Sequence, residues 1–412
     1  MPPPPKVMRN GARTTIISEN KVAAADFILM IVGIDNITPG TSTSASLSVG
    51  GMRPYVQDLL LGLPGLFPDW QFKFFTPPWN EPFEIRDPNV EVVLCPGAVK
   101  SRPGRVWFEQ VRLPGIIARE NIGIWLGTCN YLPLRIRCRT LLLIQSHQFL
   151  TNPDAFGILR GAWLRGIVRR SVRKADHVGV QCHDAKRTLL KYLKVPPDSV
   201  SVIYNRLVDL EPANPAPANL EPANDTSPGI PRPYLLYISG LYPFKNHARL
   251  IAAFARIRPE FPGLALLLAG GGSSGQLRGM AASYGLENDV LFLGRVPQSA
   301  IPGLYRNARA SVFPSLEETF GLPVLEAMSL DCPVVTSNRS SMAEVAGDAA
   351  VLVDPQSVEA IAGGLRRILT DPDLRQDLTR KGHQRCAFFT RENTVASLAA
   401  ALGDLSTACV LH

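Results

Sequence analysis

Two glutamates eight positions apart are the residues best suited to hold a polar ligand. Glu318 and Glu326 lie in the stretch 313–328, where a predicted strand ends and a predicted helix begins around Gly321. The helix has Pro323 in its first turn, where proline is favoured. The first amides of a helix have no partner within it and can bind anions or hydroxyl groups. Because Glu318 lies just outside the helix and Glu326 one turn inside, we expect both carboxylates to face one crevice and an elongated ligand.

A lysine follows another predicted strand. This strand runs into Gly240, and a short loop then brings Lys245 to the start of the predicted helix 248–257. A mobile positive charge beside free amides suits a diphosphate. The glycines at 270–272 follow the next strand and permit a close backbone approach there. The sequence therefore predicts an anion-binding edge where these strands end.

The elements around these residues alternate regularly between strand and helix. After residue 234 the predicted strands are 234–239, 264–269, 290–293, 310–313, 334–336 and 350–353, and the predicted helices are 248–257, 275–284, 301–307, 322–330 and 358–370. The first half shows the same rhythm with strands at 27–34, 71–75, 90–94, 141–145, 178–181 and 201–204, and helices at 54–61 and 185–193. Such alternation predicts an α/β fold of two facing, Rossmann-like, doubly wound parallel sheets, whose ligands bind at the carboxyl ends of the strands.

Length and proline content predict how the chain is divided. A chain of 412 residues exceeds the roughly 250–300 at which a single core stops growing. Residues 211–233 contain seven prolines and cannot form a sheet or a helix interior. We expect an N-terminal domain at 1–210, a linker at 211–233, a C-terminal domain at 234–385 and a helical terminal segment at 386–412.

Taken together, these motifs resemble glycosyltransferase family 4. The resemblance is carried by Glu-Thr-Phe-Gly-Leu-Pro-Val-Leu-Glu at 318–326, by Gly240 and the pair Lys245 and Asn246 before it, and by residues 341–350 after it. It covers nearly all of 234–390 and is thinner over the first half. It implies a GT-B fold, a nucleotide-sugar donor that is a substrate rather than a cofactor, and transfer with retained anomeric configuration. It also implies that the terminal helix crosses back to the N-terminal domain.

The resemblance also implies roles for single residues. Glu326 would hold the ribose hydroxyls of the donor, Glu318 would hold hydroxyls of its sugar, and Lys245 would neutralise the departing diphosphate. Many relatives carry an arginine where this chain has Leu241. The remaining donor-binding positions are the backbone of Phe320, Gly321 and Leu322, together with Gly294 and Arg295 near the nucleobase.

The first half carries two further positions that the resemblance implies. Gly50 and Gly51 are similar to the family's first glycine loop, which faces the diphosphate across the cleft. His147 stands where relatives carry a polar pair at the active centre, although Gln148 replaces the usual aspartate. The Ser/Thr-rich run 38–48 precedes the glycines and is a candidate acceptor loop.

The charge of the chain points to an anionic partner for the first half. Residues 100–210 contain 19 Lys and Arg against 7 Asp and Glu, a net +12 in a chain of net +8. The motifs of nucleic-acid-binding proteins are absent, so we expect no nucleic acid. The stretch 158–174 places arginines among apolar residues and suits either an ordinary solvated helix or contact with an anionic membrane. A lipid-linked acceptor would make that contact useful.

Several classes of site and location are disfavoured. The seven cysteines include no C-x-x-C pair, so neither zinc nor a disulfide framework is indicated. Asp371 and Asp373 fit helix capping better than metal binding, and we predict no metal. The apolar stretch near residue 30 is too short to span a membrane, and the N-terminus lacks the features of a signal peptide. We expect a cytoplasmic protein that can bind the membrane surface peripherally.

The leading hypothesis is a retaining glycosyltransferase of cell-surface polysaccharide biosynthesis, with a glycan or lipid-linked acceptor. A sugar-nucleotide epimerase on the same double-Rossmann plan is a second candidate, but it would need its own catalytic carboxylates. A third is a non-catalytic binding protein descended from a transferase, which Leu241 and the unusual spacing before Gly50 keep open.

Overall fold

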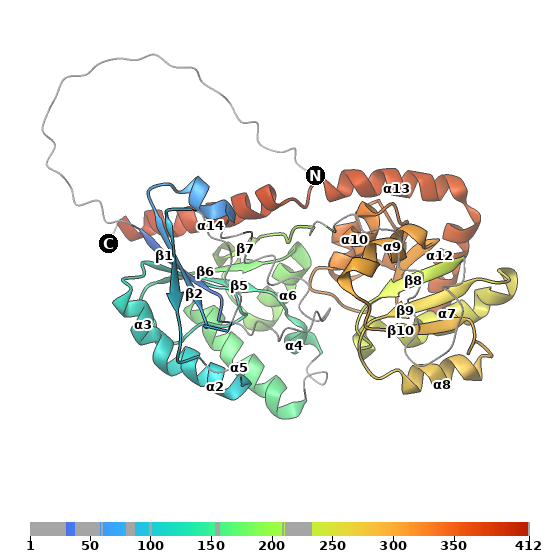
Figure 1. Ribbon diagram of the computed structural model, residues 1–412, viewed down its shortest axis with the longest axis horizontal. Helices are drawn as coiled ribbons and strands as arrows, with labels where there is room; N and C mark the ends of the chain where they lie inside the picture. Colours follow the sequence, from blue (N-terminus) through green and yellow to red (C-terminus); the bar gives the residue numbers. More distant parts are fainter. Residues whose placement is uncertain are drawn as a thin grey trace, which may run out of the picture.

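The structure is a computed structural model, and it describes residues 30–37, 58, 61–79, 87–98, 101–152, 157–207, 210 and 233–410. Within these residues the chain forms two parallel β-sheets, each flanked by helices (Figure 1). The predicted α/β fold of two doubly wound sheets is thereby confirmed.

The first sheet has seven strands among the described residues, in the order β3-β2-β1-β4-β5-β6-β7. Every pairing in it is parallel. The strands are β1 (Ile31–Asp35), β2 (Gln71–Thr76), β3 (Val90–Leu94), β4 (Ile124–Gly127), β5 (Arg139–Ile144), β6 (His177–Val180) and β7 (Val200–Val202). The strand order reverses direction between β1 and β4, which is where such sheets open a crevice.

The second sheet has six strands in the described part, in the order β10-β9-β8-β11-β12-β13. Its central strands are buried along their whole length, as expected for a parallel sheet covered on both faces. The strands are β8 (Tyr234–Ile238), β9 (Ala265–Ala269), β10 (Val290–Gly294), β11 (Ala310–Phe313), β12 (Val334–Ser337) and β13 (Val351–Val353). Here the order reverses between β8 and β11, the strands that precede Lys245 and Glu318.

The helices connect successive strands and cover the sheets. Those of the first half are α2 (Arg102–Trp107), a π-helical turn at Phe108–Arg112, α3 (Leu113–Arg119), α4 (Gln148–Thr151), α5 (Ile158–Lys174) and α6 (His183–Leu193). Those of the second half are α7 (His247–Ile257), α8 (Gly275–Ser283), α9 (Ile301–Asn307), α10 (Leu322–Ser329), α11 (Ser340–Ala346), α12 (Val358–Thr370), α13 (Pro372–Cys386) and α14 (Arg391–Val410). The prediction that Asp371 caps a helix is confirmed, because its Oδ1 accepts from Leu374 N at 2.8 Å.

Some elements differ from their predictions. Strand β4 and helices α2 and α3 were not predicted. Of the helix predicted at 54–61, residues 58 and 61 are described and are helical, and the described helix runs on to residue 66. Gly50, Gly51, the run 38–48 and residues 211–232 lie outside the described residues. The domain boundaries therefore stay predictions.

The last helix leaves the second sheet and packs on the first. Figure 1 shows α13 beside the second sheet and α14 continuing along the first. Helix α14 contacts β5 and β6. Val395, Leu398 and Leu402 are buried with Val32 and Ile34 of β1 in one apolar cluster. None of the helices within the described residues has the length and apolar character needed to cross a membrane.

Candidate functional site

The carboxyl ends of β8, β9 and β10 are joined by backbone hydrogen bonds. Leu241 N donates to Gly271 O at 2.9 Å, and Gly270 N donates to Gly294 O at 2.7 Å. Gly270 has a φ of +150°, and a Cβ there would lie 1.9 Å from Ser239 O. Only glycine permits this approach. The predicted close approach of the backbone is thus present, and the loop of Lys245 begins on it.

Lys245 and Glu318 meet at this edge of the sheet. Lys245 ends a 3₁₀ turn after β8, and its Nζ contacts Glu318 Oε1 in the loop after β11. The hydroxyl of Tyr237 fixes the loop by donating to Lys245 O at 2.7 Å. Ser341 Oγ donates to Glu318 O at 2.9 Å from the opposite side. The structure therefore brings together the two charged side chains for which the family resemblance implies contacts with the diphosphate and the sugar.

Asn246 lies beside this pair but points into the protein. Its Nδ2 donates to Pro314 O at 2.9 Å and to Pro355 O at 2.7 Å, and its φ is +65°. Both amide hydrogens are thereby used inside the domain. Asn246 joins the β8 and β11 loops, which keeps Lys245 beside Glu318.

Glu326 occupies the second turn of α10 and has a partner of its own. Its Oε2 is 3.3 Å from the hydroxyl of Tyr305. Burial of the carboxyl raises its pKa to about 7, and the hydrogen bond from Tyr305 opposes the shift more weakly. Gly321 begins α10 with a φ of +99° after the buried Phe320. Leu322 is the first residue of the helix, so its amide belongs to the partner-free turn.

Arg295 lies at the same sheet edge, on the surface. A Cβ on Gly271 would come within 2.7 Å of Arg295 Nε, so the arginine stem lies across the glycine backbone. Gly240 is also packed closely, with the ring of Tyr242 2.8 Å from the position of a Cβ. Within the described ranges, no group of three or more His, Cys, Asp or Glu side chains is placed to hold a metal ion.

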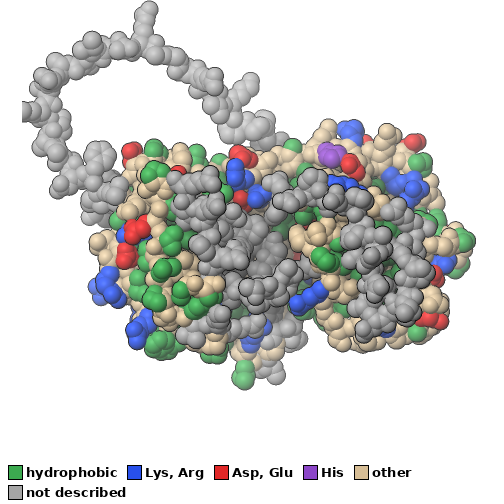
Figure 2. All heavy atoms as spheres, viewed as in Figure 1, with side chains coloured by type: hydrophobic (Ala, Val, Ile, Leu, Met, Phe, Trp, Pro, Cys, Tyr) green, Lys and Arg blue, Asp and Glu red, His purple; other side chains and the backbone are tan. Residues whose placement is uncertain are grey.

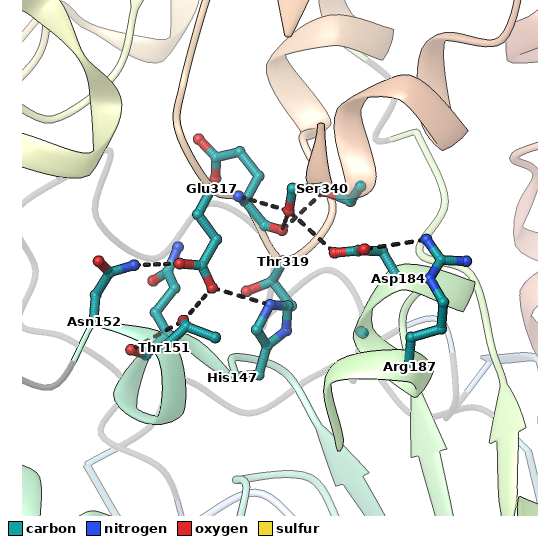
Figure 3. Close-up of polar contacts among 12 residues, drawn as sticks. His147, Thr151, Asn152, Asp184, Arg187, Glu317, Thr319 and Ser340 are labelled. Atoms are coloured by element: carbon teal, nitrogen blue, oxygen red, sulfur yellow. Dashed lines mark hydrogen bonds and ion pairs between the residues drawn. The ribbon is translucent and has the colours of Figure 1, made fainter. Parts of the chain in front are cut away.

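His147 faces this site from the other domain. It follows β5, is 1% exposed, and its Nε2 lies 3.3 Å from Glu317 Oε1 (Figure 3). Thr151 Oγ1 and Asn152 Nδ2 donate to the two oxygens of the same carboxylate. Glu317 was not predicted. Two features of the sequence could have indicated its role. Glu317 directly precedes Glu318, and the polar residues Thr151 and Asn152 lie one turn after His147.

A second carboxylate of the C-terminal domain is also held by the N-terminal domain. Glu344 on α11 accepts from the amides of His183 and Asp184, at 2.8 and 3.0 Å, at the N-terminus of α6. It also accepts from the hydroxyl of Tyr204 at 2.8 Å. A helix N-terminus attracts negative charge. Ser340 Oγ also donates to Asp184 Oδ2 at 3.2 Å (Figure 3). Polar contacts between the two domains therefore lie on both sides of Thr319, with Glu317 and His147 on one side and Ser340 and Asp184 on the other.

A buried acidic cluster is formed by Asp35, at the carboxyl end of β1, and Glu109, on the π-helical turn Phe108–Arg112. Asp35 ends β1, and burial raises its pKa to about 6. Burial raises the pKa of Glu109 to about 8, and the hydroxyl of Tyr131 donates to Glu109 Oε2 at 2.5 Å. Arg105 Nε lies 3.4 Å from Glu109 Oε1. This cluster was not predicted, and it lies on the side expected to receive the acceptor.

Comparison with known proteins adds family matches over both halves. Residues 223–385 match the family described as Glycosyl transferases group 1, and residues 49–211 match Glycosyltransferase Family 4. The chain is 38% identical over 166 residues to an O-antigen chain mannosyltransferase B of Escherichia coli, covering 39% of this chain and 43% of that protein. It is 28% identical over 244 residues to a D-inositol 3-phosphate glycosyltransferase of Corynebacterium glutamicum, covering 57% and 58%. The chain thus spans about half the length of these curated relatives.

Among solved structures, a similar one is the sucrose-phosphate synthase from Thermosynechococcus elongatus. The TM-score is 0.70 at 21% identity, over 92% of this chain and all of that one. At this identity the likeness concerns the fold, and it agrees with the two facing sheets described above.

Proposed function

Because the chain belongs to the group 1 glycosyltransferases, we propose that it moves a sugar from a nucleotide-sugar donor to a glycan or lipid-linked acceptor, with retained anomeric configuration. The observation that carries the proposal is the contact between Lys245 and Glu318 at the carboxyl ends of β8 and β11. This contact lies where the strand order reverses, next to the partner-free amides of α10.

The chemistry assigned to the donor side is electrostatic. Glu326 holds the ribose, and Glu318 with the amides that begin α10 holds the sugar. As the glycosidic C–O bond breaks, its electron pair passes to the oxygen of the leaving diphosphate, and Lys245 stabilises the charge that forms there. The acceptor hydroxyl attacks the face that the diphosphate leaves and gives up its proton to the leaving phosphate.

The acceptor side of the proposal rests on the first sheet. Asp35 ends β1, Glu109 lies on the π-helical turn before α3, and His147 contacts Glu317 of the other domain. Relatives named for O-antigen chain mannosyl transfer support a role in cell-surface polysaccharide biosynthesis. They also make a nucleotide-activated mannose the first donor to test.

The test is turnover of the full chain with a panel of nucleotide sugars and glycan acceptors. We expect release of nucleoside diphosphate that depends on the acceptor, and a product whose anomeric proton shows the donor's configuration by NMR. Appearance of an epimerised nucleotide sugar without diphosphate release would instead identify an epimerase. Saturable donor binding without either product would identify a binding protein.

We extend the proposal to peripheral contact with an anionic membrane through α5. Leu159 and Trp163 on this helix are 87% and 40% exposed, whereas Ile167 and Val168 pack inward. Arg169, Arg170 and Arg173 are exposed on the same helix. Figure 2 shows hydrophobic side chains with basic ones among them on the surface of the N-terminal domain. Apolar and basic groups together on one helix suit an anionic lipid surface.

A further inference from the structure

Glu317 belongs to the C-terminal domain, but its described side-chain partners belong to the N-terminal domain. Its carboxylate contacts His147, Thr151 and Asn152, which come from β5's carboxyl end and from α4 (Figure 3). The carboxylate is 16% exposed and the imidazole 1%. This contact exists only while the two domains face each other as they do here.

The contact determines where the imidazole of His147 carries its proton. An ionised carboxylate has no proton to donate, and the nitrogen nearest to it is Nε2, at 3.3 Å from Oε1. In a neutral imidazole, one nitrogen carries the proton and the other accepts, and a neighbouring group decides which. Glu317 therefore favours the proton on Nε2 and leaves Nδ1 as the acceptor.

Nδ1 itself is buried and has no hydrogen-bond partner among the described residues. A buried acceptor without a partner is uncommon. It can accept a hydrogen bond only from a donor that reaches this buried position, such as a hydroxyl of a bound ligand. With the opposite tautomer, the same nitrogen would be a donor and could not do so.

We infer that Glu317 is a positioning residue that couples closure of the two domains to the tautomer of His147. Closure brings the carboxylate to Nε2, and the imidazole then presents Nδ1 as an acceptor. When the domains separate, the carboxylate leaves and neither nitrogen is favoured by it. The consequence for catalysis rests on the proposed function, whereas the tautomer itself does not.

The direct test is ¹⁵N NMR of the imidazoles of the full chain, which contains six histidines. His147→Gln identifies the resonances. We expect the wild type, free or with GDP or UDP, to show His147 protonated at Nε2 at a pH where the ring is neutral. Glu317→Ala should shift the population toward an Nδ1 proton. Glu317→Gln should retain the wild-type tautomer, because the amide oxygen can still accept from Nε2.

Glu344→Ala is the matched control. It removes another carboxylate that joins the domains, at His183 and Asp184, without touching His147. We expect it to shift the tautomer less than Glu317→Ala does, because the carboxylate of Glu317 is still present at His147 whenever the domains meet. An equal shift in Glu344→Ala and Glu317→Ala would overturn the inference, as would a wild type without a preference for Nε2. Circular dichroism of each variant shows whether it is folded, and Glu317→Gln gives a readout should the alanine variant unfold.

Turnover gives a second readout. In metal sites, loss of the carboxylate that orients a ligating histidine costs about ten- to a hundredfold in activity. By analogy, we expect kcat of Glu317→Ala to fall about tenfold and that of Glu317→Gln to fall less. An unchanged kcat in Glu317→Ala would overturn the catalytic consequence. If the wild type itself releases no nucleoside diphosphate, the proposed function fails, while the NMR result still decides the tautomer.

Discussion

Lys245 and Glu318 form an ion pair although 73 positions separate them in the chain. Each side chain comes from a loop at the carboxyl end of its own strand, and they are 15% and 9% exposed. The lysine is therefore held by a carboxylate before any ligand binds. A bound diphosphate would share this lysine with Glu318 without having to order a mobile side chain, which lowers the entropic cost of binding.

Replacement of Lys245 by alanine should lower kcat more than it raises the donor KM. The negative charge on the diphosphate grows as the bond breaks, so the lysine contributes most in the transition state. We expect a loss of roughly a hundredfold, as for other single electrostatic groups. Steady-state kinetics with varied donor measure both constants.

Arg256→Ala is the control for this prediction. It removes a cation from the nearby helix α7, where Arg256 pairs with Glu359 on the surface. Exposed pairs contribute little to stability or activity, so kcat should stay at the wild-type value. A Lys245→Ala enzyme with normal kcat would show that another cation serves the diphosphate.

The donor affinity should depend on pH through Glu326. Burial raises its pKa from 4.5 to about 7, and the ionised carboxylate accepts hydrogen bonds from two vicinal hydroxyls. Donor KM should therefore fall as the pH rises through about 7. Glu326→Gln should abolish this step and raise KM with a smaller effect on kcat, because ribose is held alike in ground and transition states. An unchanged KM would contradict the assignment.

The raised pKa of Glu326 also makes the free energy of unfolding depend on pH. The folded state binds the proton of Glu326 more tightly than the unfolded chain, so the wild type should lose stability as the pH rises from 4.5 to about 7. Glu326→Gln should remove that loss. The surface residue Glu359 on α12 supplies the control substitution, Glu359→Gln, which should leave the pH profile unchanged.

Substitution by alanine should change the free energy of unfolding in opposite directions at two glycines of the C-terminal domain. Gly270→Ala places a Cβ 1.9 Å from Ser239 O at a φ of +150°, and we expect it to lower the free energy of unfolding by more than about 2 kcal/mol. Gly275, which opens α8, has no atom within 4 Å of its Cβ position. Gly275→Ala should raise stability by up to about 1 kcal/mol, mainly through the unfolded chain. Urea titration of both variants measures the difference, and equal effects would contradict the described loop.

Binding to anionic vesicles should depend on α5. Each basic residue near the surface contributes about 1 kcal/mol, and the attraction fades in salt. Co-sedimentation with phosphatidylserine vesicles should be lost in a variant carrying Gln at Arg165, Arg169, Arg170 and Arg173. A charge-matched control carries Gln at Arg256, Arg278, Arg306 and Arg380 in the other domain. Equal binding by both variants, or no binding by the wild type at low salt, would leave α5 as an ordinary solvated helix.

The second half of the fold could be read from the sequence because its strands are short apolar runs separated by regular helices. Helices α2 and α3 were missed because Pro103 and Pro114 interrupt the pattern. Pro103 occupies the first turn of α2, where the missing amide costs nothing, whereas Pro114 follows the π-helical turn at Phe108–Arg112. Strand β4 was missed because it has only four residues, and so short an apolar run does not distinguish a strand from a buried helix segment.

The donor side of the site was predicted more completely than the contacts across the cleft. Lys245 and Glu318 each follow a recognisable strand, so their meeting needs only the parallel sheet. The contacts of Glu317 and Glu344 depend on how one domain faces the other, and no local pattern encodes that angle. The motif predicted that Asn246 lies beside Lys245. It did not predict that the side chain of Asn246 points into the protein, because that direction depends on the left-handed backbone at this residue.

Helix α14 has one more consequence. Because it returns to the first sheet, the polypeptide passes between the domains twice, once before β8 and once between α13 and α14. Two covalent connections therefore join the domains and limit how far they can separate. The cleft faces then stay at a high effective concentration relative to each other even when they are apart. If the domains open, their reclosing is an intramolecular step whose rate is independent of protein concentration.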